Sequence, residues 1–200
     1  MPIIGSLAGA SSKSLGGLGA SVIVLPSTGY ISIASTTLTT NTSSITFSSI
    51  PNTYKHLQIR GVARGTYAAY NYPIFISFNN DTGANYQNQG FIANQSGLGL
   101  LGYYDNASNY LYAQRIAGDS SPANYFGGVV FSIMDYAETN KNKNILGEAG
   151  GALSGGSSNN WCVGPYGGNW RNNSAINTIT LTPQYGSFTA NTRFSLYGII

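Results

Sequence analysis

The chain has 200 residues, of which 42% are hydrophobic and only 8% are charged, against roughly a quarter charged in an ordinary soluble domain. Its net charge of +3 comes from Lys and Arg residues scattered singly along the chain, which argues against a nucleic-acid partner, because such binding needs clustered cations. A single cysteine, Cys162, excludes an internal disulfide and a cysteine-based zinc site, and no apolar run approaches the ~20 residues of a membrane span.

The N-terminal segment, residues 1–29, is rich in Gly and Ser, with isolated apolar side chains between them. It lacks the cationic start, the apolar core and the cleavage site of a secretion signal. Such a segment gains order only by lying against other surfaces, because fixing Gly-rich backbone costs much entropy. We therefore expect an extended docking arm that contacts the domain itself or, preferentially, a neighbouring subunit. Its contact residues are predicted to be Ile3, Ile4, Leu7, Leu15 and Leu18.

From residue 30 onward, short alternating segments are separated by Gly, Asn, Asp, Ser and Pro, and no window has a sustained helical period. This pattern predicts an all-β fold, an antiparallel, jelly-roll-like β-sandwich that occupies residues 30–200. The predicted strands are 30–34, 44–50, 56–64, 74–78, 110–116, 128–134, 143–146, 161–163, 176–182 and 193–199.

Alternation within three of these strands also assigns their faces. The predicted inward residues are Leu57, Ile59, Gly61, Ile179, Leu181, Phe194, Leu196 and Gly198. Because the chain closes on an apolar strand, Ile199 and Ile200 are expected to be packed.

The segments between strands suggest one turn and two long loops. Residues 79–83 combine Asn, Asp and Gly as a turn requires, although the oxygens of residues 79–85 also superficially resemble a calcium loop. Residues 83–109 and 147–160 are rich in Gly, Asn, Ser and Tyr, which suits either binding loops or plain solvated loops. The aromatic residues Tyr103, Tyr104, Trp161 and Trp170 are candidates for a surface that binds sugars or protein partners, and they suit equally the packing of sandwich ends.

No catalytic or cofactor motif stands out in the chain. His56 is the only histidine, so any Ser-His-Asp triad would depend on it, and the sequence has no Gly-x-Ser-x-Gly motif. The six acidic residues show no spacing typical of a catalytic pair, and the Gly-rich stretches lack the Gly-Lys-Ser/Thr ending of a phosphate loop. We therefore predict no enzyme activity, no cofactor and no metal site.

Three stretches taken together resemble a family of tailed-bacteriophage virion proteins. The first stretch is ITFSSIPNTYKHLQIRG at 45–61. The second combines FNNDTGANY at 78–86 with DYAETNKNK at 135–143. The third is WRNNSAINTITLT at 170–182, followed by FSLYGI at 194–199. The resemblance covers about residues 44–200. Asn80 departs from it where family members often have Gly, and Asn142 departs where an aromatic is common.

The resemblance implies a β-sandwich module that does structural or adhesive work in the virion and has no active site. The leading hypothesis is a tail-fibre or baseplate-associated component on the surface of a phage particle, which docks through its N-terminal arm. Its expected partners are other virion proteins, further copies of itself, with three copies as in fibres, and a host-surface glycan, with no membrane insertion. A capsid decoration protein and a free-standing carbohydrate-binding module are the alternatives.

Overall fold

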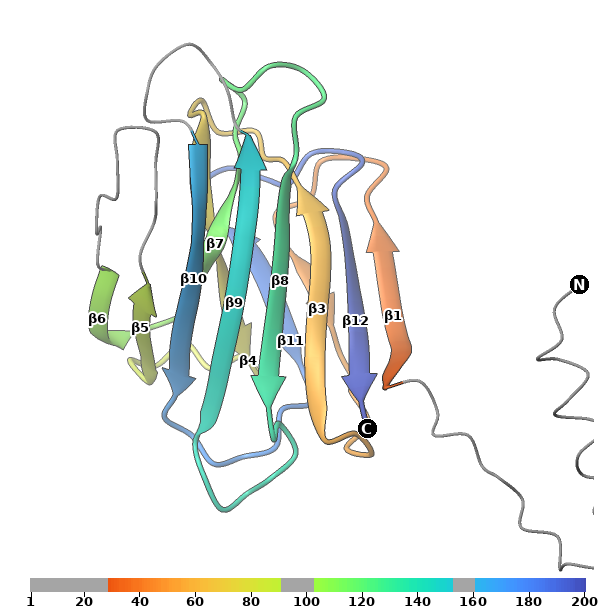
Figure 1. Ribbon diagram of the computed structural model, residues 1–200, viewed down its shortest axis with the longest axis vertical. Helices are drawn as coiled ribbons and strands as arrows, with labels where there is room; N and C mark the ends of the chain where they lie inside the picture. Colours follow the sequence, from red (N-terminus) through yellow and green to blue (C-terminus); the bar gives the residue numbers. More distant parts are fainter. Residues whose placement is uncertain (1–28, 91–102, 153–160) are drawn as a thin grey trace, which may run out of the picture.

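The computed structural model describes residues 29–90, 103–152 and 161–200, which form twelve β-strands (Figure 1). The strands are β1 (Tyr30–Thr37), β2 (Ile45–Phe47), β3 (His56–Ala63), β4 (Asn71–Phe78), β5 (Tyr86–Gly90), β6 (Tyr103–Ser108), β7 (Leu111–Ala117), β8 (Gly127–Met134), β9 (Lys143–Ala152), β10 (Trp161–Trp170), β11 (Ile179–Pro183) and β12 (Arg193–Ile199). The predicted arm residues Ile3, Ile4, Leu7, Leu15 and Leu18 lie outside the described residues.

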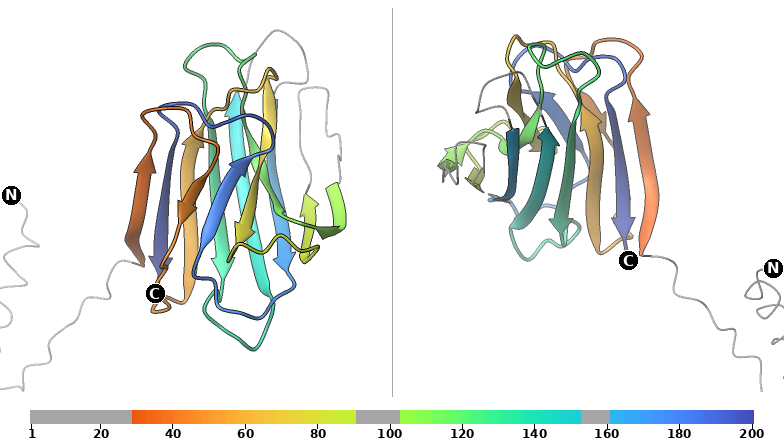
Figure 2. Two further views of the ribbon diagram at one scale, coloured as in Figure 1. Left: turned by 180° about the vertical axis from the view of Figure 1, so that it is seen from behind. Right: turned by 45° about the horizontal axis from the view of Figure 1, so that its top comes forward.

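Two antiparallel sheets pack face to face (Figure 2). The large sheet has the strand order β1-β12-β3-β8-β9-β10-β5-β6, and the small sheet has the order β2-β11-β4-β7. The chain crosses repeatedly from one sheet to the other, so strands that are neighbours in a sheet are often distant in sequence. The predicted all-β, jelly-roll-like sandwich is therefore confirmed.

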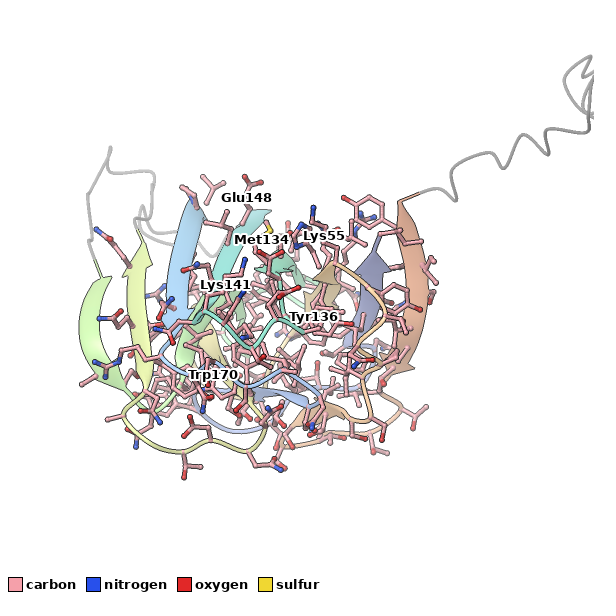
Figure 3. The ribbon with its side chains drawn as sticks, turned by 90° about the horizontal axis from the view of Figure 1, so that it is seen from below. Lys55, Met134, Tyr136, Lys141, Glu148 and Trp170 are labelled. Atoms are coloured by element: carbon pink, nitrogen blue, oxygen red, sulfur yellow. The ribbon has the colours of Figure 1, made fainter. Side chains whose placement is uncertain are left out.

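The core lies between the two sheets and consists of the inward side chains of both. The predicted inward residues Leu57, Ile59, Ile179, Leu181, Phe194 and Leu196 are all buried there. Figure 3 shows Tyr136 and Trp170 in this layer between the sheets. The prediction for the last residue was wrong, since Ile200 is 61% exposed beyond the end of β12.

Both predicted long loops contain strand residues that the sequence pattern did not reveal. Strands β5 and β6 lie within 83–109, and β9 continues through 147–152. Their Gly and Asn residues hid these strands because such residues are usually depleted from sheets. At Gly147, close packing is the reason for glycine, because a Cβ there would lie 2.8 Å from Cδ1 of Phe131. Asn88 is buried in β5, where its side chain bonds the backbone of the β6–β7 region at Tyr110 and Tyr112.

The turn after β4 has the geometry expected of its residues. Asn79 and Asn80 adopt φ of 50° and 57°, the left-handed region that Asn and Gly tolerate best. The Asp81 carboxylate then accepts hydrogen bonds from the Gly83 N–H at 2.8 Å, from the Asn85 amide and from the Trp170 indole N–H at 2.7 Å. These donors fasten the turn to the end of β10, so the turn interpretation of residues 79–83 agrees with the structure.

Candidate functional site

The outer face of the large sheet, the face turned away from the small sheet, is unusually apolar. In an antiparallel sheet with one solvated face, outward side chains are normally polar. Here Val62 of β3, Val130 of β8, Leu146 of β9 and Val163 of β10 all point outward and are 47%, 39%, 58% and 58% exposed. This face is turned toward the viewer in Figure 1, and no described element covers it.

Strand register arranges the outward residues of the central strands in three rows. Each row is named after one aliphatic residue, and its members are given in the strand order β12, β3, β8, β9 and β10. The Val62 row consists of Arg193, Val62, Gly128, Gly150 and Val163. The Val130 row consists of Ser195, Arg60, Val130, Glu148 and Pro165, and the Leu146 row consists of Tyr197, Gln58, Ser132, Leu146 and Gly167.

An open hollow of about 900 Å³ lies on this face, and the adjacent glycines Gly128 and Gly150 are among the residues that line it. Its lining also includes three aliphatic residues, Val62, Val130 and Val163, and three charged residues, Arg60, Glu148 and Arg193. The hollow is not required by packing, because a Cβ on Gly150 would meet no atom closer than 3.8 Å. An apolar, unfilled depression on an exposed sheet is a typical feature of an interaction surface.

Two glycines of β9 test whether the hollow is free space. We expect Gly150→Ala to leave the free energy of unfolding unchanged or to raise it by up to about 1 kcal/mol, because alanine suits a strand better than glycine. Gly147→Ala is the matched control and should lower that free energy by about 1–3 kcal/mol, because the new methyl group would collide with Phe131. Urea unfolding of both variants measures the difference, and equal losses would contradict this description of the hollow.

Charged side chains of both signs lie in the Val130 row. The Arg60 guanidinium lies over the rings of Tyr30 and Tyr197, at 4.5 and 5.2 Å from their centroids, and its Nε–H donates to Gln58 Oε1 at 2.6 Å. Figure 3 shows Glu148 on the outward side of the large sheet. Among the described residues, Glu148 takes part in no ion pair. The face therefore presents an oriented cation and, two strands away, an anion that has no ion-pair partner in the described part of the chain.

His56 belongs to a separate polar cluster at the end of β3. Its Nδ1 accepts a hydrogen bond from the Asp135 backbone N–H at 2.9 Å, and the Asp135 carboxylate binds Lys141 Nζ at 2.5 Å. The hydrogen bond from Lys141 holds the pKa of the Asp135 carboxyl below its usual value. His56 and Lys141 thus both hold Asp135, in the loop after β8. In the described part of the chain, no three His, Cys, Asp or Glu side chains gather in a metal-binding cluster.

The structure corrects one of the predicted surface aromatics. Trp170 is only 1% exposed, because its ring packs among core residues between Phe78 and Tyr86 while its indole N–H is held by Asp81. It therefore offers no binding platform. Tyr103 and Tyr104 lie in β6 and Trp161 begins β10, but the side chains of all three fall outside the described residues.

Sequence reasoning missed the apolar outer face. One signal was available in β8, whose Val129 and Phe131 face inward while Val130, between them, is also apolar. A strand that is apolar on both sides is unusual in a sheet with one solvated face. The neighbouring contributions from β3, β9 and β10 could not be found in this way, because they depend on the register between distant segments.

The chain matches no protein-family model, and it has no match among curated proteins. Among the residues that the structure describes, there is no helix of a length and hydropathy suited to crossing a lipid bilayer.

Proposed function

We propose that this chain is a non-enzymatic structural component of a tailed phage virion, a tail-fibre or baseplate-associated module that assembles through the outer face of its large sheet. The observation that carries the proposal is the group of four exposed aliphatic side chains, Val62, Val130, Leu146 and Val163, on one sheet face. Free-standing soluble domains rarely expose contiguous apolar surface of this kind, whereas assembling subunits use it as an interface.

Two further properties of the chain support this role. A low content of charged residues, 8%, reduces the desolvation cost when large surfaces are brought together. The resemblance of residues 44–200 to virion proteins points to the same class. In this proposal, residues 1–29 dock the module on the particle, other virion proteins and further copies of this chain are its partners, and a host-surface glycan is its target.

Immunogold labelling of purified phage particles tests the proposal directly. Antibodies raised against the chain are expected to label the tail or its fibres, and mass spectrometry of the same particles should detect the chain. Label confined to the head would support a capsid decoration protein instead. Absence of the chain from particles whose genome encodes it would refute the virion assignment.

A carbohydrate-binding role is the second candidate, and one pair of rings favours it. Tyr67 and Tyr185 are 42% and 47% exposed, with ring centroids 4.6 Å apart and an interplanar angle of 33°. Exposed tyrosine rings suit the apolar faces of sugars. A glycan array probed with the full chain should then show binding that Tyr185→Ala removes, while Tyr125→Ala, another exposed tyrosine, leaves it unchanged.

A further inference from the structure

The outer face has a symmetry that follows from its three rows. Strand β8 lies at the centre of the five strands that form them, with β3 and β9 on its two sides and β12 and β10 beyond these. Consider two copies whose outer faces are in contact, with a two-fold axis that lies between the faces and runs parallel to β8. Rotation about this axis would place β3 of one copy over β9 of the other copy, and β9 over β3. Each row would then lie over the same row of the partner, in reversed order.

Charge complementarity is the first consequence of this rotation. In the Val130 row, Arg60 and Glu148 stand on opposite sides of Val130, one strand from it in each direction. The rotation therefore places the backbone of Arg60 over that of the partner's Glu148, and the backbone of Glu148 over that of the partner's Arg60. Two equivalent ion pairs form when the Arg60 side chain turns from the Tyr30 and Tyr197 rings toward the partner, which is the pattern of an isologous interface.

Shape complementarity is the second consequence. In the Val62 row, the side chain of Val62 would lie over the partner's Gly150, and in the Leu146 row Tyr197 would lie over the partner's Gly167. Both glycines are open on this face, since a Cβ on either would meet its nearest atom at 3.8 Å. Protruding side chains thus face depressions on both sides of the axis, and Val130 meets Val130 at the centre.

The available area agrees with a stable pair. Five strands, from β12 to β10, spaced ~4.8 Å apart and each contributing ~20–25 Å of length, offer about 500–600 Å² per copy. Two such faces bury about 1,000–1,200 Å² in total, at the lower limit for a specific protein–protein interface.

We infer that the partner of the outer face is the outer face of a second copy of this chain, related by a two-fold axis along β8. The inference rests on the proposed assembly role of this face and names its partner. It replaces the three-copy arrangement expected from fibres with a back-to-back dimer in which Arg60 pairs with the partner's Glu148.

A cysteine at the axis gives the sharpest test. The Val130→Cys variant, in a Cys162→Ser background, is expected to form a disulfide-linked dimer under mild oxidation, because the two thiols would meet on the axis. Thr46→Cys in the same background is the control, since Thr46 is exposed on the outer side of the small sheet. Equal cross-linking of the two variants, or none at position 130, would overturn the inference.

Oligomeric mass and a charge exchange complete the test on the full chain. Light scattering should give twice the 21.1 kDa of one chain. We expect Gly150→Trp and Glu148→Arg each to weaken dimerisation at least about tenfold, and Arg60→Glu combined with Glu148→Arg to restore most of it. Circular dichroism checks that each variant is folded. A monomer, a trimer, or a dimer indifferent to both single substitutions would overturn the inference.

The two proposals can fail independently. A dimer with these properties that is absent from phage particles would refute the virion assignment alone. A chain found in particles but monomeric in solution would refute the dimer alone.

Discussion

Replacing Lys143 with methionine is expected to lower the free energy of unfolding by about 3–5 kcal/mol. Lys143 is fully buried at the start of β9, and its ammonium group donates to the backbone carbonyls of Glu138, Lys141 and Asn173. Methionine has a similar length but no donor, so three carbonyls would lose their partner in a site that water cannot easily reach. Chemical denaturation measures the loss.

Lys141 provides a matched control two residues earlier. Its side chain is half exposed and forms an ion pair with Asp135 on the surface. Lys141→Met removes the same charge but should cost no more than about 1 kcal/mol, because exposed ion pairs contribute little. Similar losses for the two variants would mean that the three carbonyls do not depend on Lys143.

The second large effect is expected at Asp81, where Asp81→Asn should lower the free energy of unfolding by about 2–3 kcal/mol. The carboxylate receives N–H donors from three residues, Gly83, Asn85 and Trp170, and an amide has only one oxygen to offer them. The amide nitrogen would also oppose at least one of these donors. Thr82→Ala, an exposed neighbour in the same turn, is a control expected to be close to neutral.

The same contacts predict a dependence on pH. Burial alone would raise the pKa of the Asp81 carboxyl, but hydrogen bonds from Trp170, Gly83 and Asn85 outweigh it and hold the pKa below the ordinary value of 3.8. A carboxyl with a depressed pKa in the folded state stabilises the fold above its unfolded pKa, and this contribution is lost as pH falls through the folded pKa. The difference in stability between wild type and Asp81→Asn should therefore shrink below about pH 4. Asp135 titrates in both proteins, so its effect cancels in the difference. A difference that stays constant down to pH 2 would contradict this account.

The sequence predicted those parts of the fold in which neighbouring residues alone determine the outcome. In β3, β11 and β12, the buried face is apolar and most residues of the other face are polar, so the period of two identified both the strand and its buried side. Strands β5 and β6 were not predicted, because their Gly, Asn and Gln residues show no such alternation. Asn88, for example, is buried because it forms hydrogen bonds with residues beyond β6, and the residues next to it in the sequence do not indicate these bonds.

The candidate site depends on information of another kind. The indole N–H of the buried Trp170 is satisfied by Asp81, which lies 89 positions away in the chain. Because the residues next to a tryptophan do not reveal such a partner, the sequence alone does not distinguish a buried tryptophan from an exposed one. The outer face likewise needs the register of β3, β8 and β9, which sets Arg60, Val130 and Glu148 in one row. Pairing between distant segments creates both features.

The position of β12 has a consequence for the order in which the protein folds. Strand β12 lies between β1 and β3, and its residue Ile199 pairs with both Tyr30 and His56. Among the described strands, β1 pairs with β12 alone, so its partner in the large sheet is about 160 residues away and is synthesised much later. Sheets closed by such distant pairings fold slowly and expose unpaired strand edges in the meantime. We expect the large sheet to stay incomplete until β12 has been synthesised, and the chain to be most prone to aggregation before that point.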